Sequence, residues 1–163
     1  YKRAMSNPPD VPFSTTILVR DTCLCLHAQR AARALARRFD DALKPFGLTN
    51  GQFSLLMSLN RPEPPPMGPV AELLAMDQTT LTAALKPLER RGLVERRPNP
   101  HDRRSRLLAL TAGGVAALAS AVPVWTQVHA EIEEGLANPD SLRADLQVLS
   151  FGTAGPVPTQ SGG

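Results

Sequence analysis

The strongest constraint on the fold of this chain is a pair of helix start signals separated by a tight turn. Pro69 suits the first turn of a short helix ending near Leu74, because proline lacks only an N–H that a first turn leaves unbonded. Asp77 is a favoured N-cap and predicts a second helix that extends to Arg91 and is closed by Gly92. We therefore expect a short helix, a tight turn and a longer capped helix.

A basic hairpin is predicted directly after these two helices. Residues 93–97 and 105–110 form short strand-like runs, and the residues between them are rich in proline and charge. Thr111 then caps a long helix that extends to about Gly135. Two helices followed by a hairpin is the element order of a winged helix-turn-helix, whose second helix can enter a major groove of DNA.

Further helices are predicted on both sides of this lobe. Apolar side chains spaced by three or four positions predict one continuous helix over about residues 15–44. Thr49 and Gln52 match a capping box at the start of the next helix, and a last helix is expected at 140–150. Leucine and alanine dominate the apolar residues, which favours helix over sheet. The expected fold class is mainly α, with a winged helix-turn-helix lobe between long terminal helices.

Charge is distributed unevenly along the chain. Between residues 77 and 111, eight basic side chains accompany four acidic ones, whereas beyond residue 111 one arginine accompanies five acids. The eight are Lys86, Arg90, Arg91, Arg96, Arg97, Arg103, Arg104 and Arg106. A basic lobe beside an acidic C-terminal part predicts one surface that faces double-stranded DNA.

The predicted DNA contacts lie on the first turns of the second helix and on the hairpin. Small or amide side chains can reach base edges and phosphates, and arginines at a hairpin tip can enter the minor groove. The candidates are Gln78, Thr79, Thr80, Thr82 and Lys86 on the helix, and Arg103, Arg104 and Arg106 on the hairpin.

The same residues resemble the multiple-antibiotic-resistance regulator (MarR) family of transcription regulators. The matching motifs are residues 77–82, 85–94 and 102–105, followed by Leu110-Thr111 and Gly114. The resemblance implies a homodimer, a pseudo-palindromic operator and, in most members, repression that a small molecule or an oxidant releases. It also implies that Asp102 pairs with Arg104 to stabilise the hairpin, with Arg103 nearer the DNA.

The resemblance further implies four parts of the chain, in which the first and last helices form the dimer interface. The expected parts are an N-terminal arm and first dimerisation helix at 1–46, the DNA-binding lobe at 47–111, C-terminal dimerisation helices at 112–150 and a flexible tail at 151–163.

A small-molecule effector has four candidate contacts. His27 and Arg30, with Phe53 and Met57 as an apolar wall, could line a pocket between the dimer helices and the DNA-binding lobe. The plainer interpretation is that Phe53 and Met57 belong to the core and that Arg30 lies on the surface.

Cys23 is a candidate oxidant sensor, although a buried cysteine is usually an inert small apolar residue. Cys23 and Cys25 would point about 200° apart on a helix and could not form a disulfide with each other. Cys23 and His27 share a helix face, but no third ligand accompanies them, so neither a metal nor another cofactor is expected.

Three broad classes are disfavoured by the sequence. No nucleophile elbow, phosphate loop or paired metal motif supports an enzyme. No apolar run is long enough to span a bilayer and no signal-peptide pattern is present, so a cytoplasmic protein without a membrane partner is expected. Two alternatives to an effector-released repressor remain, namely a thiol-based oxidant-sensing regulator and a winged-helix module that binds protein instead of DNA.

Overall fold

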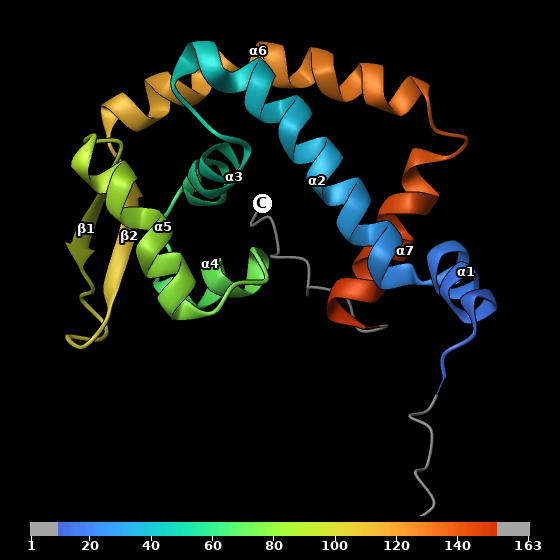
Figure 1. Ribbon diagram of the computed structural model, residues 1–163. Coiled ribbons are helices and arrows are strands. Elements are labelled where there is room, and N and C mark those ends of the chain that lie inside the picture. Colours follow the sequence, from blue (N-terminus) through green and yellow to red (C-terminus); the bar gives the residue numbers. More distant parts are fainter. Residues whose placement is uncertain (1–9, 153–163) are drawn as a thin grey trace, which may run out of the picture. The chain divides into compact units, whose positions relative to one another are not determined.

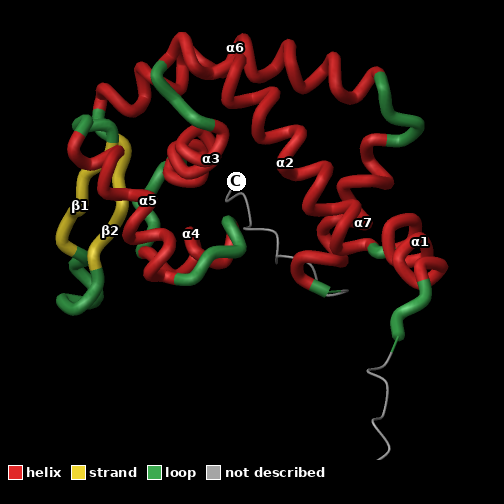
Figure 2. Tube along the Cα trace, in the orientation of Figure 1, coloured by secondary structure: helices red, strands yellow, loops and turns green. Residues whose placement is uncertain are grey.

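The computed structural model describes residues 10–152 (Figure 1). Its elements are helices α1 (Phe13–Thr22), α2 (Leu24–Leu43), the 3-10 helix η1 (Lys44–Phe46), α3 (Asn50–Leu59), α4 (Met67–Leu73) and α5 (Gln78–Arg90), strands β1 (Val94–Pro98) and β2 (Arg106–Leu110), and helices α6 (Ala112–Glu134) and α7 (Pro139–Phe151). The order confirms a mainly α chain that contains a winged helix-turn-helix. Figure 2 shows β1 and β2 in yellow, and they form a two-stranded hairpin within the described residues.

The chain divides between Arg38 and Phe39 into two compact units. In unit 1, the prediction of one continuous helix over residues 15–44 is wrong at Cys23, where an extended backbone (φ −71°, ψ 107°) separates α1 from α2. Cys23 Sγ accepts a hydrogen bond from the backbone N–H of Leu26 at 3.4 Å and so caps α2. No proline or glycine marks this break, and the apolar spacing continues beyond it. The sequence therefore carries no signal that the helix ends here.

Unit 2 has a core made mainly of leucine. Its largest fully buried side chains are Leu43, Leu55, Leu56, Leu81, Leu85, Leu88, Leu108 and Val70. They come from the end of α2, from α3, α4 and α5, and from β2, so helices and hairpin share one core. Burying a leucine stabilises a fold by about 1.5–3 kcal/mol relative to leaving it in water.

The helix starts of this unit follow cap chemistry. The predicted capping box is confirmed, because Thr49 Oγ1 accepts from the N–H of Gln52 and Gln52 Oε1 accepts from the N–H of Thr49, each at 3.2 Å. Helix α4 begins at Met67, two residues before the predicted start, so Pro69 lies inside its first turn. Ala75 adopts a positive φ of 51° in the tight turn before α5.

The two strands pair antiparallel, with Val94 opposite Leu110 and Pro98 opposite Arg106. The proline-rich connection before α4 lies along this hairpin, because the N–H of Leu108 donates to the carbonyl of Pro65 at 2.8 Å. Helices α4 and α5 contact each other, and α5 contacts β1. The packing therefore places the hairpin beside α5, where a wing is expected.

The junction between α5 and α6 is tightly packed. Thr111 Oγ1 accepts from the N–H of Gly114 at 3.0 Å and donates to the carbonyl of Gly92 at 2.5 Å, so one hydroxyl caps α6 and links it to the residue that closes α5. A Cβ on Gly114 would lie 2.1 Å from the carbonyl oxygen of Leu93. Only glycine fits at this position.

Helix α7 begins at the cap residue Asn138, whose Oδ1 accepts from the N–H of Ser141 at 2.9 Å. None of its residues is buried, although Leu142, Leu146 and Leu149 occupy one face. Most of the predicted N-terminal arm and flexible tail lie outside the described residues, except that Phe13 begins α1 and Phe151 ends α7. Within residues 10–152, no helix combines the length and apolar character that crossing a membrane requires.

Candidate nucleic-acid interface

The first turn of α5 is fixed by its cap. Asp77 Oδ1 accepts from the backbone N–H of Thr80 and Oδ2 accepts from the Thr80 hydroxyl, both at 2.8 Å. These bonds favour the ionised carboxylate, so the backbone N–H first and the hydroxyl second hold the pKa of Asp77 below its usual value of 3.8. The hydroxyl proton of Thr80 is engaged by the cap, whereas Gln78 and Thr79 are exposed beside it.

The outward face of α5 is set by the face that it buries. Leu81, Leu85 and Leu88 follow a helical spacing and are fully buried. A shallow hollow of about 410 Å³ lies on α5 itself, lined by Gln78, Thr79, Thr82, Ala83 and Lys86. The structure thus brings four of the five predicted helix contacts together on one side of α5.

The tip of the wing is shaped by short polar contacts. Asp102 Oδ1 accepts from the backbone N–H of Arg104 at 2.9 Å, and Asn99 Nδ2 donates to Ser105 Oγ at 2.7 Å. Asp102 therefore pairs with Arg104, as the resemblance implies, and stabilises the turn through the backbone N–H of Arg104. Arg103, Arg104 and Arg106 are all exposed, so their guanidinium groups are available to an anionic partner.

One ion pair joins the wing to α5, and sequence reasoning missed it. Arg96 Nε of β1 donates to Glu89 Oε1 of α5 at 2.5 Å, and Arg96 Nη1 also lies 4.0 Å from Met67 Sδ. This contact joins the middle of β1 to the helix that carries the predicted contacts with DNA bases. The sequence shows that Arg96 follows α5 closely. It does not show that Glu89 is its partner, because that depends on how β1 packs against α5.

The apolar effector candidates lie in unit 2 around the single tryptophan. Trp125 stacks on Phe53 with ring centroids 5.9 Å apart and on His129 at 4.7 Å. Helices α3, α4 and α6 border a hollow of about 400 Å³. Its lining is Phe53, Ser54, Met57, Ser58, Leu73, Leu74, Val122 and Trp125. Phe53 is a core residue, whereas Met57 is 41% exposed.

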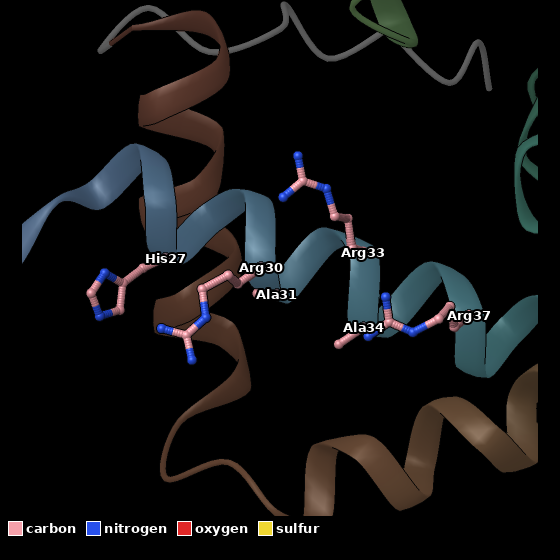
Figure 3. A pocket seen from close by; sticks show the side chains of 6 residues that line it. All are labelled: His27, Arg30, Ala31, Arg33, Ala34 and Arg37. Carbon is pink, nitrogen blue, oxygen red and sulfur yellow. The ribbon is translucent and has the colours of Figure 1, made fainter. Parts of the chain in front are cut away.

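The polar effector candidates lie on α2 in unit 1. His27 and Arg30 border a surface hollow of about 620 Å³ together with Ala31, Arg33, Ala34 and Arg37 (Figure 3). All six belong to one helix, and Figure 3 shows Arg33 extending away from His27 and Arg30. The structure therefore places the four effector candidates in two separate hollows, one in each unit.

The cysteines differ from the expected geometry because Cys23 caps α2 from outside the helix. The helical spacing argument against a bond between Cys23 and Cys25 therefore does not apply, although both thiols are free. His27 Nδ1 lies 2.8 Å from the carbonyl oxygen of Cys23, so its ring contacts the backbone at this break. Within the described part of the chain, no group of three or more His, Cys, Asp or Glu could hold a metal.

Comparison with known proteins shows which family this chain belongs to. The MarR family model matches residues 48–105, which include α3 to α5, β1 and the turn of the wing. The transcriptional regulator MosR of Mycobacterium tuberculosis, solved in complex with DNA, is 38% identical in sequence to this chain. The match has a TM-score of 0.73 and covers 78% of this chain and 93% of MosR. The chain belongs to the MarR family.

Two further proteins resemble this chain at lower coverage or lower sequence identity. The chain is 36% identical to the multiple antibiotic resistance protein MarR of Escherichia coli over 80 residues, 49% of this chain and 56% of that protein. CouR of Rhodococcus jostii RHA1, bound to p-coumaroyl-CoA, is 28% identical with a TM-score of 0.70, over 82% of this chain and 95% of CouR. CouR has also been solved as a transcriptional repressor on a 23-mer DNA duplex.

Membership of the MarR family makes this chain a DNA-binding transcription regulator. MosR and CouR are both transcriptional regulators, so the expectation that the chain is not an enzyme is confirmed. The chain spans less than two thirds of the length of several curated relatives that it matches, among them MarR.

Proposed function

We propose that this chain is a homodimeric repressor that binds a pseudo-palindromic operator and is released by a small-molecule effector. The observation that carries the proposal is the exposed face of α5 beside a wing with three exposed arginines. Each protomer supplies one α5 to one half-site, and the two helices must match successive major grooves about 34 Å apart. Arginines of the wing enter the adjacent minor groove or contact its phosphates.

The homodimer is supported by leucines that the single chain leaves exposed. Leu142, Leu146 and Leu149 on α7 are 41%, 43% and 59% exposed, and Leu24 on α2 is 68% exposed. A helix stripe of this kind needs an apolar surface to cover it, and a second copy of the chain supplies one. The dimer interface predicted for the first and last helices accounts for this exposure.

Effector release is supported by the apolar hollow between α3, α4 and α6. An aromatic ligand that stacks beside Trp125 and contacts Phe53 and Met57 would press on α4 and α6 together. It lowers operator affinity by its preference for the conformation whose α5 helices have the wrong spacing. Because the relative CouR binds p-coumaroyl-CoA, hydroxycinnamates and their coenzyme A thioesters are the first probes.

DNA binding is tested by sequencing the genomic fragments that the purified protein retains at two salt concentrations. We expect one pseudo-palindrome to remain enriched at the higher salt, whereas loss of all fragments would leave only phosphate binding. Arg103→Ala with Lys86→Ala should lower both the affinity and its salt dependence. Unchanged DNA binding in that double variant would overturn the assignment of DNA contacts to Arg103 and Lys86.

Effector binding is tested through Trp125, the one tryptophan of the chain. Its fluorescence should change as a hydroxycinnamate enters the hollow, and Ser54→Phe should abolish the change by filling the space. Ser120→Phe, on α6 but outside that lining, is the matched control and should leave the titration intact. An unaltered titration in Ser54→Phe would exclude this hollow as the effector site.

A thiol-based sensor is the second candidate function, favoured by the position of Cys23 at the start of α2. Peroxides oxidise accessible thiols, and the thiol of Cys23 is free and only half-buried. Cys23 Sγ already accepts the N–H of Leu26 at this helix start. If the function is oxidant release, Cys23→Ser should stay on its operator in peroxide, and undiminished release would exclude Cys23.

A further inference from the structure

The hollow on α5 has a definite chemical pattern along its length. Gln78, Thr82 and Lys86 are spaced by four residues, so they form one row along the helix, and Thr79 and Ala83 form the row beside it. An amide lies at one end and an ammonium group at the other. The middle is formed by two small side chains, Thr82 and Ala83.

The middle of this hollow offers methyl groups, whereas a helix that reads bases often offers hydrogen-bond donors there. Thr82 Oγ1 donates its only proton to the carbonyl oxygen of Gln78 at 2.7 Å, so the hydroxyl has no further proton for a base. Ala83 is exposed and carries only its β-methyl group. Neither residue can donate to N7 or O6 of a purine.

The chemistry of the major groove selects one partner for such a surface. The 5-methyl group of thymine is the apolar feature that base pairs present there, and alanine and the threonine methyl are suited to contact it. A guanine at the same place would lose water from N7 and O6 without gaining a donor, which costs binding energy.

We propose that Thr82 and Ala83 select thymine in each half-site by contact with its 5-methyl group. The proposal rests on the proposed function, since it assumes that α5 enters the major groove. Gln78 and Lys86, at the two ends of the row, contact the flanking base pair and phosphate. The two small residues are therefore specificity-determining residues, whereas the wing supplies affinity that depends less on sequence.

Deoxyuridine tests the proposal, because it differs from thymidine only by the methyl group. The strongest duplex is first selected from a random-sequence library, and each thymidine is then replaced singly by deoxyuridine. We expect one or two positions in each half-site to lose about fourfold in affinity, the effect of one buried methyl group. All other replacements should leave the affinity unchanged.

Matched variants assign the effect to residues. Thr82→Ser keeps the hydroxyl that bonds to Gln78 and removes only the methyl group, so its preference for thymidine over deoxyuridine should shrink. Ala83→Ser, which adds a polar group, should shrink it as well. Arg103→Ala in the wing is the control and should weaken binding to both duplexes by the same factor.

The outcomes separate this proposal from the function on which it rests. Failure of the selection to yield any preferred duplex would overturn the proposed function. A preferred duplex whose affinity survives every deoxyuridine replacement would overturn the thymine contact alone. A methyl effect that persists in full in Thr82→Ser with Ala83→Ser would overturn its assignment to these residues.

Discussion

Helices α5 and α7 are both 13 residues long, and both carry three leucines at the same helical spacing. On α5 the leucines are Leu81, Leu85 and Leu88, each 0% exposed, whereas Leu142, Leu146 and Leu149 on α7 are 41–59% exposed. The stripe is thus a local property of each helix, and its burial depends on what surrounds it. The lobe around α5 supplies its own core, whereas no part of residues 10–152 buries the stripe of α7.

The largest expected effect comes from breaking the stripe of α7. Leu142→Asp with Leu146→Asp should prevent dimerisation and lower operator affinity by about a thousandfold, because two half-sites no longer bind together. Light scattering measures the mass, and fluorescence anisotropy with a labelled operator measures the affinity. Ser141→Asp, on the same helix, is the control and should remain dimeric. A dimer with full affinity in the double variant would refute the assignment.

The corresponding change in α5 should act on folding. Leu85→Ala leaves a cavity in the core of the lobe and should reduce the free energy of unfolding by about 3 kcal/mol. Leu146→Ala should cost far less when unfolding is followed at a concentration where the chain is monomeric. Urea unfolding measured by circular dichroism distinguishes the two, and equal losses would show that the contrast between the helices is unfounded.

The tight packing of the lobe extends to the first turn of α6, where two adjacent glycines sharpen the comparison. Gly114→Ala forces a Cβ against the carbonyl oxygen of Leu93 and should cost about 2 kcal/mol of stability. Gly113→Ala meets its nearest atom at 3.4 Å and should be neutral or slightly stabilising, since alanine favours helix. Thermal unfolding measures both variants, and equal shifts of the unfolding midpoint would contradict the difference expected between the two glycines.

The smallest expected effect concerns the caps of the two helices. The carboxylate of Asp77 caps α5 with a lowered pKa, so its contribution to stability is present above pH 3.8 and lost as the pH falls through the folded pKa. Asp77→Asn should remove that pH dependence. Helix α7 is capped by the amide of Asn138, which does not titrate. The free energy of unfolding, measured with urea between about pH 2 and 6, should depend less steeply on pH in Asp77→Asn than in the unmodified chain. Asn138→Ser should leave this pH dependence unchanged.

The sequence predicted the features whose causes lie within a few residues. Asp77, Thr49 and Thr111 all cap the helices predicted for them, because a cap involves only its own side chain and an N–H three residues on. The outward face of α5 was predictable for the same reason, since the buried leucines fix it. The break at Cys23 escaped because cysteine has little intrinsic preference for ending a helix.

Features that depend on distant parts of the chain could not be predicted. The partner of Arg96 is Glu89, and this contact exists only because β1 crosses the end of α5. The sequence predicted one shared pocket for the four effector candidates, yet His27 and Met57 line different hollows. Residue type indicates what a side chain can bind, whereas tertiary packing decides which side chains are neighbours.

The hydroxyl of Thr111 has a consequence for the operator itself. Because it links the end of α5 to the start of α6, α5 keeps a fixed orientation on the helix that follows the wing. In the proposed dimer, α6 would then set the distance between the two α5 helices as long as no effector is bound. Adding one base pair between half-sites shifts and rotates the second groove by about a tenth of a turn, so the affinity of the effector-free dimer for that operator should fall. Spacing between half-sites would therefore be as much a part of the recognised signal as the bases themselves.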